Sequence, residues 1–234
     1  MNSSHDSVEP VDWPWIEGWF DHGPLEPEFM DALWSLGWRH FGTRFFRYSR
    51  TEMSGNPVRV IPLRVDLSRW TPSRSQSRIL RGSRDLEVGF HRPDPTDEHR
   101  DLFVRHASRF RENVPESLET FLGADPGRRA DPRAYPCDCV QVELRAGRRL
   151  VALSYLDLGR QAASSVYAFF DPEESWRSPG WLTFLAEIEH ARARGCRHLY
   201  PGYAYVEPSP YDYKKRLGAL EAFDWSRWQL WQPA

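Results

Sequence analysis

The chain has 234 residues, of which 40% are hydrophobic and 14% aromatic, so it can bury a core and is not a disordered chain. No apolar run approaches the ~20 residues needed to cross a bilayer. Residues 1–10 hold neither a basic residue nor an apolar block, which argues against a signal peptide. Three cysteines are too few for a disulfide framework, and we therefore expect a soluble cytoplasmic protein.

The net charge of −2 conceals a very uneven distribution. Residues 1–38 carry eight acids and no Lys or Arg, whereas residues 39–84 carry eleven Arg against two acids, a net +9. A strongly basic segment in an otherwise acidic chain indicates a local site for a polyanion such as nucleic acid. The alternative is that Arg is simply abundant in this chain, but abundance does not account for the missing acids.

The first elements that the pattern predicts are one helix and two strands. Residues 24–38 read as a helix, and Gly37 is suited to end it. Residues 43–48 and 57–67 have the composition and alternation of strands. Pro62 lies inside the second strand and predicts an edge position or a bulge there, because it has no N–H to donate.

Two further helices and a long loop complete the first half. A basic helix is predicted from residue 72 towards 86, with Thr71 or Ser73 as its N-terminal cap. An amphipathic helix is predicted over residues 97–113. Residues 123–136 contain three Pro and two Gly, which is typical of a loop or a crossing between domains.

The second half has a clearer order of elements. Residues 139–145 and 149–157 are predicted to form a hairpin, and residues 164–170 a third strand. A helix over 179–194 and a strand over 197–203 follow. This order of three strands, a helix and a strand is typical of acyltransferases of the GNAT type.

We therefore predict an α/β protein whose C-terminal half is a GNAT-like acyltransferase core, with a smaller N-terminal α/β segment packed on it. The predicted domains are residues 1–122, with the basic segment, and residues 137–234, the catalytic domain. In a GNAT fold, the loop before the central helix offers backbone N–H groups to the donor, and here that loop is residues 177–180. Short loops with Gly before helices are common, so this loop alone identifies no function.

Six stretches together carry a resemblance that spans residues 36–216. They are residues 36–42 (LGWRHFG), 57–60 (PVRV), 72–78 (PSRSQSR), 163–172 (ASSVYAFFDP), 199–203 (LYPGY) and 213–216 (YKKR). In order and spacing they resemble the arginyl-tRNA–protein transferase family, including its short bacterial leucyl-transferring branch. The resemblance implies that Leu or Arg moves from an aminoacyl-tRNA to the N-terminal amine of a protein or peptide that begins with Asp or Glu, a protein modification of the N-degron pathway.

The chain departs from this family at its cysteines. Members carry a Cys near the N-terminus and a Cys cluster before the PVRV stretch, which holds an iron–sulfur centre or metal in some of them. The matching positions here are Ser49, Glu52 and Gly55. Cys137 and Cys139 are too close in sequence for the usual metal knuckle. We therefore expect no cofactor, no iron–sulfur cluster and no metal.

The implied reaction is aminolysis of an ester, which needs proximity, a neutral amine, donors for an oxyanion and a proton for the leaving ribose hydroxyl. Asp157 ends a predicted strand where the family also places an acid, and it either holds the acceptor amine or caps a turn. Tyr203 and Tyr213 are the other catalytic candidates. No Ser-His-Asp set is required for this chemistry.

The candidate acceptor-binding residues are Lys214, Arg216 and Tyr167. Lys214 and Arg216 offer charge-assisted bonds to the carboxylate of an acidic N-terminal residue. The alternative is that this block is a solvated start of a helix, and that Tyr167 is a core residue of its strand.

The candidate tRNA-binding residues lie mainly on the predicted basic helix, where Arg suits contacts to phosphate. They are Arg74, Ser75, Gln76, Arg78, Arg81 and, in the loop before the later helix, Arg177. The alternative is that these residues brace the two halves of the fold. His40, His106 and His190 are expected to be structural rather than ligands.

Two other functions remain open on the sequence. The same donor chemistry can serve a dedicated peptide natural-product precursor, for which the missing Cys cluster is the motive. The other is a non-catalytic protein that binds tRNA or a degron. The presence of the candidate site residues Asp157, Tyr213 and Lys214 argues against it. A CoA-dependent acyltransferase would need a Gly-rich pyrophosphate loop, which this chain lacks. Oligomeric state and the choice between Leu and Arg cannot be predicted.

Overall fold

The computed structural model describes residues 13–110, 116–122 and 135–232. The strands are β1 (Glu17–Asp21), β2 (Arg39–Phe41), β3 (Arg44–Tyr48), β4 (Arg50–Met53), β5 (Asn56–Asp66), β6 (Glu87–His91), β7 (Asp138–Ala146), β8 (Arg149–Leu158), β9 (Ala162–Phe170), β10 (His198–Tyr205), β11 (Leu220–Phe223) and β12 (Trp228–Leu230). The helices are α1 (Pro27–Ser35), α2 (Arg74–Gly82), α3 (Asp97–Ala107), α4 (Glu119–Leu122), α5 (Pro179–Ala193) and the 3₁₀ helices η2 (Pro172–Arg177) and η3 (Pro210–Arg216). None of the helices among these residues is long and apolar enough to span a bilayer.

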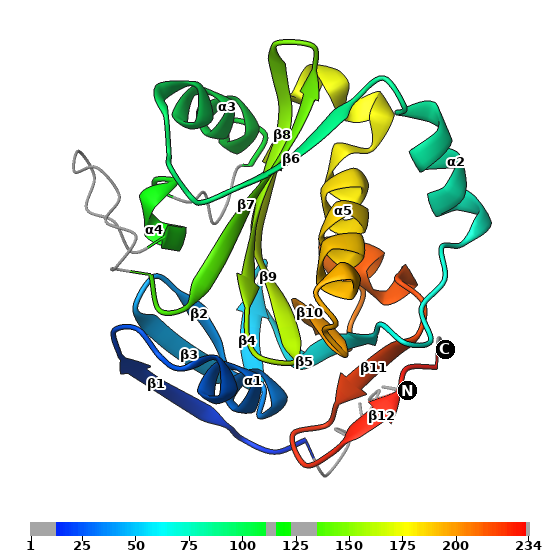
Figure 1. The fold of residues 1–234 in the computed structure, drawn as a ribbon. Helices are drawn as coiled ribbons and strands as arrows, with labels where there is room; N and C mark the ends of the chain where they lie inside the picture. The colour runs from blue at the N-terminus through cyan, green and yellow to red at the C-terminus, as the bar shows by residue number, and fades with distance from the viewer. Residues whose placement is uncertain (1–12, 111–115, 123–134, 233–234) are drawn as a thin grey trace, which may run out of the picture.

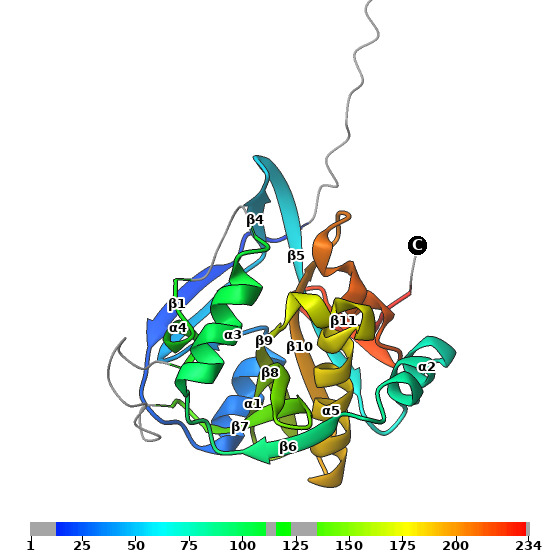
Figure 2. The same cartoon turned by 90° about the horizontal axis from the view of Figure 1, so that it is seen from above.

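One large sheet organises the molecule (Figure 1). Its strands follow the order β12-β11-β5-β10-β9-β8-β7-β6, and β4 pairs with β5 outside this path. A smaller sheet has the order β1-β3-β2. Helix α5 covers one face of the large sheet, and α1 and α3 lie on the other (Figure 2). Strands β5 and β6 come from the N-terminal half of the chain, so both halves contribute to the same sheet.

The predicted C-terminal core is confirmed element by element. Strands β7, β8 and β9 are joined as antiparallel neighbours, and the turn between β7 and β8 contains Gly147 at φ 59°, a conformation that glycine adopts without strain. Helix α5 then crosses over, so that β10 runs parallel to β9. Leu182, Leu185 and Ile188 form the buried stripe that holds α5 on the sheet.

The strand that contains Pro62 is not at the edge of the sheet. Strand β5 lies between β10 and β11, and Pro62 pairs with Tyr203 of β10 beside a register shift in that strand. On the other side of β5, pairing with β4 ends at Arg59 and pairing with β11 begins at Leu63. Pro62 therefore lies between the end of the pairing with β4 and the start of the pairing with β11. Its missing N–H removes no hydrogen bond from the sheet.

The N-terminal helices are shorter than the sequence predicts. Helix α1 ends before Gly37, which has φ 81° as a C-terminal cap requires. Ser73, rather than Thr71, caps α2. The predicted loop over 123–136 lies largely outside the described residues. Strands β1, β2, β4, β6, β11 and β12 were not predicted, because short strands of mixed polarity have no clear period.

Helix α1 is fastened to the large sheet by one carboxylate. Asp31 accepts backbone N–H bonds from Gln161, at 2.8 Å, and from Ala162, at 3.1 Å, both at the start of β9. A Cβ on Gly159 would clash with this carboxylate, so the turn before β9 needs glycine. The contact therefore fixes α1 against the start of β9.

We predict that Asp31→Ala lowers the free energy of unfolding by about 1–3 kcal/mol, because two N–H groups lose a charged acceptor. Glu28→Ala is the matched control. Glu28 is an acid on the same helix, but its side chain is exposed and forms only a long, exposed ion pair with Arg160, at 3.8 Å. Denaturant unfolding of the two variants checks the prediction. Equal midpoints for both variants would contradict it.

Candidate active site

The site lies where two neighbouring strands separate. Strands β9 and β10 pair at only three positions, from Ala162–His198 to Ser164–Tyr200. Beyond these pairs, β9 continues with β8 and β10 continues with β5. The split therefore opens at Ser165 on one strand. Side chains from both faces of the sheet meet at this point.

Arg39 bridges the two strands at the start of the split. Its guanidinium, carried by β2, donates to the Ser164 hydroxyl and the Ser165 carbonyl on β9, and to the Tyr200 carbonyl on β10 at 3.4 Å. Burial lowers the pKa of Arg39, yet a guanidinium keeps its charge at neutral pH. No carboxylate among the described residues forms an ion pair with it. A positive charge is thus fixed at the split without a direct counter-ion.

Lys214 places a second cation beside the first. Helix η3, which Ser209 caps, carries Lys214, and its ammonium donates to the Tyr203 carbonyl at 3.0 Å. Burial and the nearby Arg39 lower the pKa of Lys214 to about 7. A Cβ on Gly202 would lie 3.3 Å from the Lys214 Nζ and 3.6 Å from the guanidinium of Arg39, and Gly202 has φ 92°. Glycine is therefore required for the two cations to approach β10.

Glu187 enters the same region from helix α5. It is fully buried, and its carboxylate accepts a bond from the Ser165 hydroxyl at 2.6 Å. Burial raises the pKa of Glu187 to about 7, although the bond from Ser165 and the charge of Arg39 oppose the shift. Its second oxygen has no hydrogen-bond partner among the described residues. This carboxyl group can take up or release a proton near neutral pH.

The arrangement is suited to bind an anion and to move a proton. Arg39 and Lys214 lie beside β10 with no ion-pair partner in the described part of the chain, so a carboxylate or an oxyanion in the split gains charge-assisted bonds when Lys214 is protonated. A group that exchanges a proton near pH 7 lies beside them. These are two of the requirements of ester aminolysis.

The three predicted catalytic residues have different surroundings. Asp157 is buried, and its Oδ2 lies 2.7 Å from His40 Nε2. The Tyr203 hydroxyl donates to the Gly37 carbonyl at 2.7 Å, and burial raises its pKa strongly, so this hydroxyl holds the chain in place. Tyr213 is 41% exposed.

The predicted acceptor residues are only partly brought together. Lys214 lies in the split, whereas Arg216 is exposed and its carbonyl accepts a bond from Gln76 at 3.4 Å. Tyr167 stacks on Phe121 with ring centroids 3.9 Å apart, and burial raises its pKa to about 12. Tyr167 thus belongs to an aromatic cluster at the side of the split.

Of the predicted tRNA residues, the arginines of α2 form one exposed stripe. Arg74, Arg78 and Arg81 are exposed, and none has an ion-pair partner among the described residues. Ser75 is exposed beside Ser73, with their hydroxyls 2.9 Å apart. Gln76 is buried and completes the cap with Ser73, so it supports the helix.

Arg177 and much of the basic block have internal partners. Arg177 pairs with Glu174 at 2.7 Å and with Asp85 at 2.8 Å, which neutralises its charge. Arg59 and Arg64 of β5 likewise pair with acids of the C-terminal half. The exposed arginines of the block without an ion-pair partner among the described residues are Arg74, Arg78 and Arg81 of α2, Arg69 and Arg84 on either side of it, and Arg50 of β4.

Sequence reasoning missed Arg39, His40 and Glu187. Arg39 and His40 fall inside the LGWRHFG stretch that carries the resemblance, so the signal was present but had no chemistry attached to it. A carboxylate within the apolar stripe of α5 was the signal for Glu187, since a buried acid needs a partner.

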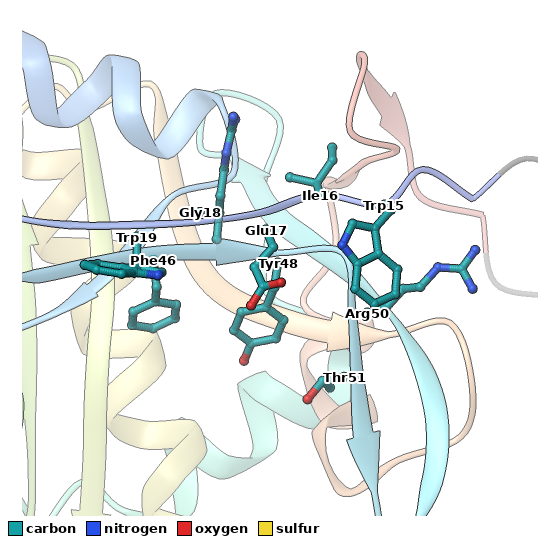
Figure 3. A pocket seen from close by; sticks show the side chains of 10 residues that line it. Trp15, Ile16, Glu17, Gly18, Trp19, Phe46, Tyr48, Arg50 and Thr51 are labelled. Atoms are coloured by element: carbon teal, nitrogen blue, oxygen red, sulfur yellow. The ribbon is translucent and has the colours of Figure 1, made fainter.

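An aromatic pocket of about 350 Å³ adjoins the split. Trp15, Trp19, Phe46, Tyr48 and Arg50 are among its lining residues, and Figure 3 shows Phe46 and Tyr48 on neighbouring positions of one strand. Both rings also contact the ring of Tyr203, whose carbonyl binds Lys214. Tyr203 therefore contacts two residues of the pocket with its ring and Lys214 with its carbonyl.

Comparison with known proteins gives the family. The model for "Arginine-tRNA-protein transferase, C terminus" matches residues 98–224. An aspartate/glutamate leucyltransferase of Saccharophagus degradans is 30% identical over 211 residues, which cover 87% of this chain and 84% of that protein. One of Stenotrophomonas maltophilia is 33% identical over 175 residues, covering 72% and 68%.

Among solved structures, the crystal structure of FemX is similar to 89% of this chain, over 70% of its own length, with a TM-score of 0.51 and 10% identity. The fold is that of a GNAT-like acyltransferase, which confirms the predicted fold class. The chain belongs to the arginine-tRNA–protein transferase family, as the resemblance implied. It is an enzyme that transfers an amino acid from an aminoacyl-tRNA.

The pKa of Lys214 predicts how stability depends on pH. In the unfolded chain a lysine keeps its proton up to about pH 10.4, whereas the folded value is about 7. Between these values the unfolded state binds more protons, so this residue makes the fold more stable as pH rises. In melting curves measured from pH 7 to 10, the melting temperature of the wild type should rise relative to that of Lys214→Met as pH increases. A constant difference would contradict the assignment of a neutral Lys214.

Proposed function

We propose that this enzyme moves leucine from leucyl-tRNA to the N-terminal amine of a protein or peptide that begins with Asp or Glu. The names of the related proteins support this donor and these acceptors. The single observation that carries the choice of acceptor is the pair of cations at the split, Arg39 and Lys214, with no ion-pair partner in the described residues. A reaction that consumes charged tRNA also supports a cytoplasmic location.

The acceptor carboxylate would bind between the two cations. An acidic side chain next to the attacking amine then anchors that amine by a charge-assisted contact. A carboxylate beside Lys214 raises its pKa again, so the ammonium becomes charged when the acceptor binds. Neutral side chains in the first position of the acceptor would leave both cations without a partner.

Proton transfer would fall to Glu187. The attacking amine forms the new amide bond, and the ester bond to the ribose breaks. A proton leaves the amine nitrogen and one is gained by the ribose hydroxyl, so the reaction is balanced. Glu187 has a pKa of about 7, near the range where an α-amine itself titrates, and is suited to take the amine's proton.

The tRNA would contact helix α2. Arg74, Arg78 and Arg81 recur every three or four residues and so line one side of the helix. Gln76 of this helix contacts the end of η3, which carries Lys214, so the stripe lies on elements adjacent to the site. Phosphate contacts of this kind position a tRNA without reading its sequence.

The direct test incubates the enzyme with tRNAs charged with a mixture of amino acids and a peptide that begins with Asp, followed by mass spectrometry. Addition of leucine supports the proposal. Addition of arginine would mean that arginyl-tRNA is the donor, while the acceptor remains as proposed. If no amino acid is added to acidic peptides, the dedicated natural-product precursor or a non-catalytic binding role replaces it. Peptides that begin with Asn measure the part played by charge.

We predict that Lys214→Met raises the KM for a peptide with N-terminal Asp roughly ten- to a hundredfold, the equivalent of ~1.5–3 kcal/mol for a charged hydrogen bond. The affinity for tRNA should stay near the wild-type value. The matched control is Lys215→Met, because the neighbouring Lys215 is bound to Asp212 at 2.7 Å. A variant that weakens tRNA binding instead would refute the acceptor role of Lys214.

We also predict that α2 governs the salt dependence of tRNA binding. Each phosphate contact contributes ~0.7–0.9 to the slope of log affinity against log salt. Arg74→Ala with Arg78→Ala should therefore flatten the slope by about one to two units. Arg148→Ala with Arg194→Ala, two exposed arginines elsewhere, is the control. An unchanged slope with a lower melting temperature would mean that α2 braces the fold instead.

A further inference from the structure

Three potential metal ligands meet behind the active site. The imidazole of His40, the thiol of Cys137 and the carboxylate of Asp157 each offer one atom, and these atoms lie within 4.8 Å of one another. His40 comes from β2, Cys137 immediately precedes β7, and Asp157 is in β8. The cluster therefore joins the small sheet to the large one.

The hydrogen bonding of His40 leaves one nitrogen directed at this cluster. Its Nδ1 lies 3.0 Å from the Gly42 carbonyl, an acceptor, so Nδ1 carries the proton of the neutral ring. The lone pair is then on Nε2, which faces Asp157 Oδ2 at 2.7 Å. Neither of these two atoms has a well-aligned hydrogen-bond partner among the described residues.

The surroundings make this a costly arrangement without a cation. His40 is 4% exposed and Asp157 is 3% exposed, so water cannot screen the two facing lone pairs. Cys139 lies directly across from Asp157 in the β7–β8 ladder, on the same side of β7 as Cys137. A proton on Nε2 or a metal ion would each relieve the conflict.

We propose that His40, Cys137 and Asp157 bind one zinc ion, with Cys139 at its open side. Nitrogen, sulfur and oxygen ligands in a closed site are those that zinc accepts, and a backbone carbonyl bound to the second ring nitrogen is the usual support of a ligating histidine. When zinc binds, Cys137 gives up its thiol proton to solvent and binds as thiolate.

The proposed site differs from two predictions made from the sequence, that the chain holds no metal and that His40 is structural; both remain predictions until metal content is measured. The proposed ligands are separated by 97 residues from His40 to Cys137 and by 20 from Cys137 to Asp157, so no local motif reveals them. The absence of an iron–sulfur cluster stays a prediction, since two neighbouring cysteines do not provide four thiolates.

The proposed ion would act as a positioning element for the active site. Arg39 precedes His40 in β2, and Arg39 is the residue that bridges β9 and β10. Fixing the His40 ring against β8 also fixes the strand from which Arg39 reaches the split. Zinc would touch no substrate and take no part in the reaction itself.

The test measures metal directly in the full-length, untagged protein. Elemental analysis should find stoichiometric zinc, and His40→Ala and Cys137→Ser should each lose it. Cys196→Ser is the control, because Cys196 lies outside the cluster and should keep full zinc content. Replacement of zinc by cobalt should give a thiolate-to-metal absorption band, which Cys137→Ser removes.

Two results would overturn the proposal. One is a folded wild type that contains no metal and shows neither a shift in melting temperature nor a cobalt band when zinc or cobalt is added. His40 and Asp157 would then form a protonated ion pair. The other is a Cys137→Ser variant that keeps the zinc content and the cobalt spectrum of the wild type, since the ligand assignment would then be wrong.

Discussion

The separation of β9 from β10 is the constraint on which the site depends. Two parallel strands that stop pairing leave backbone carbonyls without partners, and a buried unpaired carbonyl is costly. Arg39 satisfies carbonyls on both strands at once, at Ser165 and Tyr200. The same guanidinium that closes the backbone of the split also supplies its fixed positive charge. Structure and function therefore rest on one side chain that arrives from outside the GNAT-like core.

Two adjacent cations in a buried site must be offset, and the fold does so without a bound acid. Burial and Arg39 bring the pKa of Lys214 to about 7, so the Lys214 amine can lose its proton near neutral pH. Glu187 has its pKa raised to about 7 in the same region. The charge of the site is thus adjustable, and an entering carboxylate meets a site that becomes more positive as it binds.

The sequence predicted the C-terminal core well because its signals are local. Alternating apolar residues, the turn at Gly147 and the stripe on α5 each depend on neighbours within a few positions. Lys214 was placed at the site for the same reason, since a short motif carries it. Glu187 and Arg39 were missed because their roles arise from contacts across more than twenty and more than a hundred residues. Secondary-structure patterns contain no information on such pairings.

The basic block shows that charge concentrated along a chain is not always free charge in the fold. Its charge of +9 suggested one polyanion surface. In the fold, Arg39 is half-buried at the split and Arg59 and Arg64 pair with Glu207 and Glu221, whereas Arg74, Arg78 and Arg81 of α2 stay exposed without an ion-pair partner among the described residues. The block itself contains few acids, but β11 and the loop after β10 place acids from the C-terminal half beside its arginines. Charge segregated along a chain is thus paired in space wherever strands from the two halves adjoin. It remains available for binding on an element that packs by one face, as α2 does.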